Sequence, residues 1–243
     1  RLTDRNADDF QFSISISGTT IDQLEKHRPD ALESFVKLAA TGNVEILCEP
    51  YYYSLAFYKS PVEFEEQVDL HRQKIEALFG QRPVSFLNTE FCYNNELAKL
   101  VSKAGFSHIL SEGAEWALHG NTPDQVFHST SGDCSVHFRN YRLSDDVKFK
   151  YSDYSWKSYP LTAEKYYQWI KNSSGQVINL FYDYENFGEH HKKETGILEF
   201  LEKTLSKLAK DKGTQFNTIS EAGKSAELNV LNVPYTVSRA DVD

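Results

Sequence analysis

Four segments that have the composition of buried strands each end in a carboxylate. Glu49 follows VEILC, Glu90 follows FLNT, Glu112 follows HILS and Asp183 follows INLFY. In a parallel barrel the carboxyl ends of all strands lie at one rim, where the active sites of such barrels are found. We therefore expect the four acids to converge on one site. The alternative for each acid taken alone is a helix N-cap or a solvated loop residue, and for Glu112 an ordinary polar turn, SEGAE.

Two carboxyl groups in different surroundings can divide the work of glycoside hydrolysis. A carboxyl in apolar surroundings keeps its proton and can donate it, whereas a better solvated carboxylate stays ionised and can attack. Asp183 ends the most apolar strand pattern, so we expect a raised pKa and a role as proton donor. Glu90 follows Asn88 and Thr89, which predicts an ionised nucleophile.

Further side chains near these acids are candidates for binding a substrate. Residues two apart on a strand share a face, so Glu185 is expected beside Asp183. Aromatic rings suit the apolar faces of sugars, although ordinary core or loop packing is the alternative for each of them. The candidate binding residues are Glu49, Tyr53, Trp116, Glu185, Phe187 and His190.

The histidine pattern argues against a metal site. A metal-dependent carbohydrate deacetylase, which can use a similar barrel, would need a ligand cluster, typically with histidines four residues apart on a helix. None of the eight histidines lies four residues from another. We expect no metal and no cofactor, and we interpret His190 and His191 as hydrogen-bonding residues of the rim.

Apolar patterns of period 2 alternate with patterns of helical period along the chain. This alternation predicts an α/β fold with a parallel sheet. The predicted strands cover residues 10–18, 44–49, 84–90, 108–113, 125–130, 136–143, 176–187 and 215–220. The predicted helices cover residues 21–42, with an interruption at Pro29, and 60–80, 94–106, 161–172 and 195–211.

Length, charge and cysteine content set broad limits on the class of protein. The 243 residues suit one α/β barrel, and the net charge of −9 argues against a nucleic-acid-binding protein. Three cysteines without paired spacing predict reduced thiols. No apolar run is long enough to span a membrane and no signal peptide is visible, so we expect a cytoplasmic protein with no membrane partner.

Four blocks of the sequence resemble glycoside hydrolase family 57, in its α-amylase-like branch. These blocks are VEILCEPYYYSLAF, FLNTEFCYNNELAKLVSKAGF, RNYRLSDDVKFKYS and DYENFGEHHKKETGILEFL, and the resemblance extends from about Phe10 to Ser220. It implies a seven-stranded (β/α) barrel that acts on α-1,4-glucans or maltooligosaccharides with retention of configuration. By the same resemblance, Glu90 matches the nucleophile and Asp183 matches the general acid/base.

The chain departs from the family pattern in three places. The family's first strand, with a His-Gln-Pro motif, is absent, Tyr53 stands where a histidine is usual, and the helical region after the barrel is missing. We therefore expect a TIM-like barrel without its first strand over residues 1–223, and a loosely packed tail over 224–243 that leads towards a further region. Alternatives to a hydrolase are a 4-α-glucanotransferase, a branching enzyme, or a catalytically impaired glycan-binding homologue.

Overall fold

The computed structural model describes residues 10–225 and 229–242. Its strands form a two-stranded sheet, β1-β2, and a five-stranded sheet of order β3-β4-β6-β5-β7. All neighbouring strands run parallel except β5 and β6, which are antiparallel. The strands are β1 (Phe12–Ile14), β2 (Val44–Ile46), β3 (Ser85–Leu87), β4 (His108–Glu112), β5 (Val126–Ser129), β6 (Ser135–Arg139) and β7 (Asn229–Leu231).

A short connection joins the two sheets into one parallel series. Cys48, just after β2, forms a parallel bridge with Phe86 of β3. The Cys48 N–H donates to the Ser85 carbonyl at 2.9 Å, and the Leu87 N–H donates to the Cys48 carbonyl at 2.9 Å. The order β1-β2-β3-β4-β6 therefore places the carboxyl ends of five parallel strands along one rim, which confirms the predicted α/β class.

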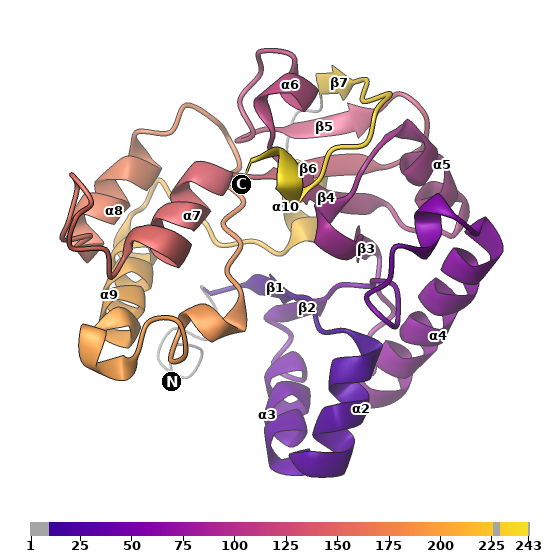
Figure 1. The fold of residues 1–243 in the computed structure, drawn as a ribbon, viewed down its shortest axis with the longest axis horizontal. Coiled ribbons are helices and arrows are strands. Elements are labelled where there is room, and N and C mark those ends of the chain that lie inside the picture. The colour runs from indigo at the N-terminus through magenta and orange to yellow at the C-terminus, as the bar shows by residue number, and fades with distance from the viewer. Residues whose placement is uncertain (1–9, 226–228, 243) are drawn as a thin grey trace.

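Helices surround this series of strands (Figure 1). In that view α2 and α3 lie below β1 and β2, α4 and α5 lie to the right of the sheet, and α7, α8 and α9 form a group on the left. Their bounds are α2 (Gly18–His27), α3 (Pro29–Ala39), α4 (Pro61–Phe79), α5 (Asn95–Lys103), α6 (Glu115–Leu118), α7 (Tyr141–Lys150), α8 (Ala163–Lys171), α9 (Ile197–Lys210) and α10 (Ile219–Ser225).

Local capping signals explain where several helices begin and end. The Ser60 hydroxyl accepts a hydrogen bond from the Glu63 N–H at 3.2 Å at the start of α4. Gly80 ends that helix in the left-handed conformation, with φ of 64°, which glycine adopts without steric cost. Asn94 caps α5 in the same way as Ser60 caps α4, through the Leu97 N–H at 2.8 Å. These helix boundaries and the interruption at Pro29 confirm the prediction.

The core consists of several apolar clusters rather than one. The largest lies around β3, β4 and β6 and contains the fully buried rings of Phe86, Phe127 and Phe138. A second cluster packs β1 and β2 against α2, α3 and α4, and a third packs α7, α8 and α9 together. The burial of these side chains supplies most of the favourable free energy that holds the strand ends in place.

The predicted strand 136–143 is wrong in its second half. Strand β6 ends at Arg139, and α7 begins at Tyr141. The cause is Asn140, whose side-chain oxygen accepts a hydrogen bond from the Leu143 N–H at 3.0 Å and so caps a helix. The helix α7 was missed because the aromatic residues of this region obscured its periodicity.

Two further predicted strands are also wrong. Segment 176–187 meets β6 only through a bridge between Asn179 and Arg139, and the Phe181 N–H donates to the Ser144 hydroxyl instead of to a neighbouring strand. Segment 215–220 forms no strand, and its last two residues begin helix α10. The first N–H groups of that helix donate to side chains of β1 and β2. The Ile219 N–H donates to the Ser13 hydroxyl at 3.0 Å, for example.

The prediction of a loosely packed tail after Lys224 is also wrong for residues 229–242. Strand β7 pairs with β5, and the side chains of Val233 and Val237 are fully buried. In Figure 1 this yellow segment runs from β7 at the top of the view down over the five-stranded sheet. The division into a barrel over 1–223 and a tail over 224–243 stays a prediction.

Two smaller findings bear on the expected class of protein. Cys48, Cys92 and Cys134 are buried free thiols, as predicted. Within residues 10–225 and 229–242, no helix combines the length and the apolar character needed to cross a membrane.

Candidate active site

Glu90 lies at the carboxyl end of β3 in an unusual backbone conformation. It is exposed and has φ of 54° and ψ of 26°, and Phe91 follows with φ of 58°. The left-handed region is unfavourable for residues with a Cβ atom, and such residues cluster at functional sites. In the described part of the chain four non-glycine residues have positive φ, and three of them, Tyr53, Glu90 and Phe91, meet here. The backbone strain therefore marks this end of β3 as a functional candidate.

Tyr53 provides a hydrogen bond to the Glu90 carboxylate. The Tyr53 hydroxyl donates to Oε1 of Glu90 at 3.1 Å. Burial and the negative charge of Glu90 raise the pKa of Tyr53 to about 12, so the hydroxyl keeps its proton and remains a donor. Tyr53 therefore holds one oxygen of the Glu90 carboxylate by a hydrogen bond.

Asp183 is paired with two cations, which the sequence did not suggest. Arg239 donates from Nη1 and Nη2 to the two carboxylate oxygens at 3.4 and 3.0 Å, and Lys148 Nζ lies 2.9 Å from Oδ2. Burial raises the pKa of Asp183, but the hydrogen bonds and charges of Arg239 and Lys148 outweigh it, so the pKa lies below its usual range. The predicted rise in the pKa of Asp183 is therefore wrong, because two distant cations reach a strand end that looked apolar.

Arg239 brings the two candidate catalytic acids into one electrostatic site. Its guanidinium group binds Asp183, and its carbon centre lies 5.4 Å from the centre of the Phe91 ring, next to Glu90 in the chain. The charges of Asp183, Glu90 and Tyr53 raise the pKa of Arg239, against the effect of burial, which lowers it. Glu90 and Asp183 therefore both act on the charge of Arg239, although the two acids are far apart in sequence.

Glu49 lies at the end of β2 but is closed off from solvent. Its side chain is 2% exposed, and its backbone N–H donates to Nδ1 of His71 at 3.1 Å. Burial raises the pKa of Glu49 to about 7, and a hydrogen bond with Ser15 opposes the rise. Glu49 therefore holds a proton over part of the neutral pH range. Direct contact with a substrate, the predicted role of this residue, would require the site to open.

Glu112 belongs to a structural ion pair. It is fully buried, and its Oε2 atom lies 2.8 Å from Nη1 of Arg139, its partner in the β4–β6 register. Arg139 also binds Asp145 of α7. Three of the four strand-terminal acids are therefore bound or enclosed by the protein, and Glu90 is the exposed one.

The remaining candidate binding residues lie in different surroundings. Glu185 and His190 are exposed, and Trp116 is 41% exposed, with its indole N–H donating to Asp241 at 3.1 Å. Phe187 packs against Tyr182 with ring centres 5.7 Å apart, in the cluster around α7, α8 and α9. The expected pairing of Glu185 with Asp183 on one face does not apply, because residues 184–186 form a turn of 3-10 helix instead of extended strand. Their roles in binding stay predictions.

Sequence reasoning missed the two cations, Arg239 and Lys148, that bind Asp183. His191, which was expected to form hydrogen bonds, is buried, with Nε2 2.9 Å from the carbonyl oxygens of Val147 and Lys148. His191 therefore supports the end of α7 that carries Lys148. The sequence carries no local signal for Arg239, whereas Lys148 lies inside one of the family-like blocks.

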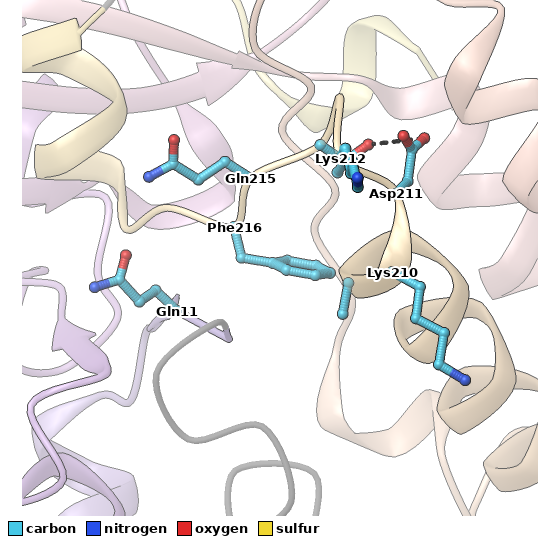
Figure 2. Close-up of a pocket in the computed structure, with 8 residues that line it drawn as sticks. Gln11, Lys210, Asp211, Lys212, Gln215 and Phe216 are labelled. Carbon is cyan, nitrogen blue, oxygen red and sulfur yellow. Dashed lines mark hydrogen bonds between the residues drawn. The ribbon is translucent and has the colours of Figure 1, made fainter.

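One hollow of the structure lies away from these acids. It encloses about 330 Å³ at the carboxyl end of α9 (Figure 2). Its lining includes Gln11, Lys210 and Phe216, together with Asp211, which Lys171 and Tyr167 already bind. None of the predicted site residues lines it, so the acids and not this hollow are the candidate site. Among the described residues no group of three or more histidines, cysteines or acids is placed to hold a metal ion.

Comparisons with known proteins identify the family of the chain. Residues 2–234 match the family described as glycosyl hydrolase family 57. A Methanocaldococcus jannaschii protein named "Putative alpha-amylase" is 41% identical over 214 residues, which are 88% of this chain and 46% of that protein. This chain therefore spans about half the length of that relative.

Two solved structures of low sequence identity share the fold. The 4-alpha-glucanotransferase from Thermococcus litoralis superposes with a TM-score of 0.77 at 16% identity, over 93% of this chain and 35% of that one. The branching enzyme from Pyrococcus horikoshii superposes with a TM-score of 0.76 at 12% identity, over 98% and 64% of the two chains. The extent of the family match, together with the Methanocaldococcus relative, shows that this chain belongs to glycosyl hydrolase family 57.

Proposed function

We propose that the chain forms the catalytic part of an α-amylase-like enzyme that hydrolyses α-1,4-glucans with retention of configuration. The observation that supports this proposal is that Arg239 binds Asp183 and that the charge of Glu90, at the carboxyl end of β3, also acts on Arg239. Family membership supports glycoside chemistry, and the relative named as an α-amylase supports the choice of α-glucans.

The two acids would act in two displacement steps. In the first step the Glu90 carboxylate attacks the anomeric carbon, the bond to the leaving sugar breaks, and the Asp183 carboxyl gives its proton to the leaving oxygen. In the second step Asp183 takes a proton from water, whose oxygen attacks the anomeric carbon and releases Glu90 as a carboxylate. Two inversions leave the product with the α configuration of the substrate.

The pKa of Asp183 has a consequence for the pH dependence of this reaction. Because Arg239 and Lys148 hold that pKa below its usual range, the protonated form becomes scarcer as the pH rises. The value of kcat/KM for unactivated glucans should therefore fall with rising pH on the basic side of an acidic optimum. The same cations make Asp183 a stronger acid, since they stabilise the carboxylate left after proton donation.

Incubation of the full-length protein with maltooligosaccharides tests the proposal. Shorter products alone, first released as the α anomer by NMR, would support a retaining hydrolase. Shorter and longer products together would instead support the 4-α-glucanotransferase alternative, and a new α-1,6 linkage would support a branching enzyme. Binding of the glucan without any product would overturn the catalytic proposal and leave a glycan-binding homologue.

A further inference from the structure

The backbone around Arg239 is held in place by contacts to the loop after Glu90. Val237 and Tyr93 exchange two backbone hydrogen bonds, each of 2.9 Å. Ser238 then begins a turn of 3-10 helix, and its side chain and backbone N–H form a capping box with Asp241. The Ser238 N–H donates to Oδ2 of Asp241 at 2.8 Å. Arg239 is therefore presented from a fixed turn and not from a free end.

The Arg239 side chain is held by the carboxylate of Asp183 and by the ring of Phe91. Its exposed fraction is 15%, and the guanidinium group forms a two-pronged contact with the Asp183 carboxylate. The flat side of Phe91 lies under the guanidinium carbon at 5.4 Å, which favours the cation through the ring quadrupole. A planar group held at two carboxylate oxygens and over a ring has little rotational freedom.

We propose that Arg239 is a positioning residue of the active site, which orients the Asp183 carboxylate and couples it to the Glu90 loop. The expected effect of Arg239 on turnover rests on the proposed glycoside hydrolysis, whereas its expected effect on the pKa of Asp183 does not. The segment that carries Arg239 would thus belong to the site itself. Replacement of Arg239 should change both the pKa of Asp183 and the pH dependence of the reaction, whereas removal of a purely structural ion pair would shift the pKa of Asp183 without moving the pH dependence of the reaction.

The groups that face Asp183 determine the sign of the effect. Arg239 approaches from the turn at residues 239–241, Lys148 approaches from α7, and Tyr184 and Glu185 follow Asp183 on its own turn. The charges of Glu90 and Tyr53 also act on Arg239 and raise its pKa. Removal of the Arg239 charge leaves Lys148 in place, so the pKa of Asp183 should rise by about one unit, the lower end of the range for an acid next to an arginine.

The experiment compares Arg239→Gln and Arg239→Lys with Arg142→Gln, a matched loss of charge. Arg142 pairs with Glu115 at an exposed site, with both side chains 71% exposed. NMR titration of the side-chain carboxyl carbons, with the Asp183 signal assigned through Asp183→Asn, measures the pKa directly. We expect the pKa of Asp183 to rise by about one unit in Arg239→Gln, by less in Arg239→Lys, and to stay unchanged in Arg142→Gln.

A second measurement separates this inference from the proposed function. The basic limb of the pH profile of kcat/KM on a maltooligosaccharide should shift to higher pH in Arg239→Gln, following the pKa of Asp183. In Arg239→Lys the same limb should shift by a smaller amount. If Asp183 titrates alike in the wild type and in folded Arg239→Lys and Arg239→Gln, the positioning role is wrong. If the titration shifts but the wild type cleaves no glucan, the electrostatic coupling is supported and the hydrolase proposal fails.

Discussion

Two acid–arginine pairs lie near the carboxyl ends of the strands, and they differ in their access to water. Glu112 and Arg139 are 2.8 Å apart, with side chains that are 0% and 2% exposed. Asp183 and Arg239 are 3.0 Å apart, with side chains that are 25% and 15% exposed. The first pair joins facing residues of two neighbouring strands, whereas the second joins two loops that meet only in the folded protein.

Phe91 connects the two pairs. The guanidinium carbon of Arg139 lies 5.9 Å from the centre of its ring, and that of Arg239 lies 5.4 Å from it. A fully buried ion pair cannot contact a substrate, and removal of one partner leaves an uncompensated buried charge. A partly exposed ion pair can exchange protons with water and form other hydrogen bonds. We therefore interpret Glu112–Arg139 as support for the scaffold next to Glu90, and Asp183–Arg239 as part of the proposed catalytic site.

The largest expected effect is on activity and concerns Glu90, the exposed acid that precedes Phe91. Glu90→Gln should lower kcat by on the order of 10³-fold or more, because the amide cannot act as a nucleophile. Its melting temperature should change little, since Glu90 is exposed. The control is Glu96→Gln, which removes an exposed carboxylate six residues further along the chain. An equal loss of activity in both variants would show that general charge, and not a nucleophile, is responsible.

The second prediction compares the two arginines directly in denaturant unfolding. Arg139→Met should lower the free energy of unfolding by about 3–5 kcal/mol, because Glu112 is left buried without its partner. Arg239→Met should cost only about 1 kcal/mol, because Asp183 keeps Lys148 and some contact with water. Equal losses in the two variants would contradict the division into a scaffold pair and a site pair.

Glu49 provides a third environment, a buried acid at the rim for which burial dominates the pKa. Its pKa of about 7 lies above the ordinary value of 4.5. A raised pKa stabilises the folded state below the ordinary pKa, and this stability is lost as the pH rises through about 7. Glu49→Gln should therefore raise the free energy of unfolding by up to about 3 kcal/mol near pH 8 and change it little near pH 4. A gain of the same size at both pH values would refute the assignment.

The smallest expected effect concerns the hydroxyl that binds Glu90. Tyr53→Phe removes one hydrogen bond to a charged group and keeps the ring, so kcat/KM should fall by about tenfold. Tyr52→Phe is the matched control, because Tyr52 is its neighbour and is 55% exposed. A similar loss in both variants would place the effect in the loop conformation and not in the contact with Glu90.

Several elements could be predicted because their causes lie within a few residues. Ser60 and Gly80 bound α4, and Asn94 begins α5, through contacts that span one turn. By contrast, segment 176–187 has the composition of a strand but meets β6 at only one bridge. An apolar run shows that a segment will be covered and does not show whether another backbone will pair with it.

For the candidate site, sequence alone identified Glu90 and Asp183, since strand ends and family-like blocks are local features. The protonation of Asp183 was decided only by the tertiary structure, because its cation Arg239 is 56 residues away and lies in a segment that looked like a tail. A pKa depends on every charge within a few ångströms, whatever its distance along the chain. The choice of Glu90 and Asp183 as candidates therefore rests on local sequence features, whereas the protonation of Asp183 depends on which cations the fold brings close to it.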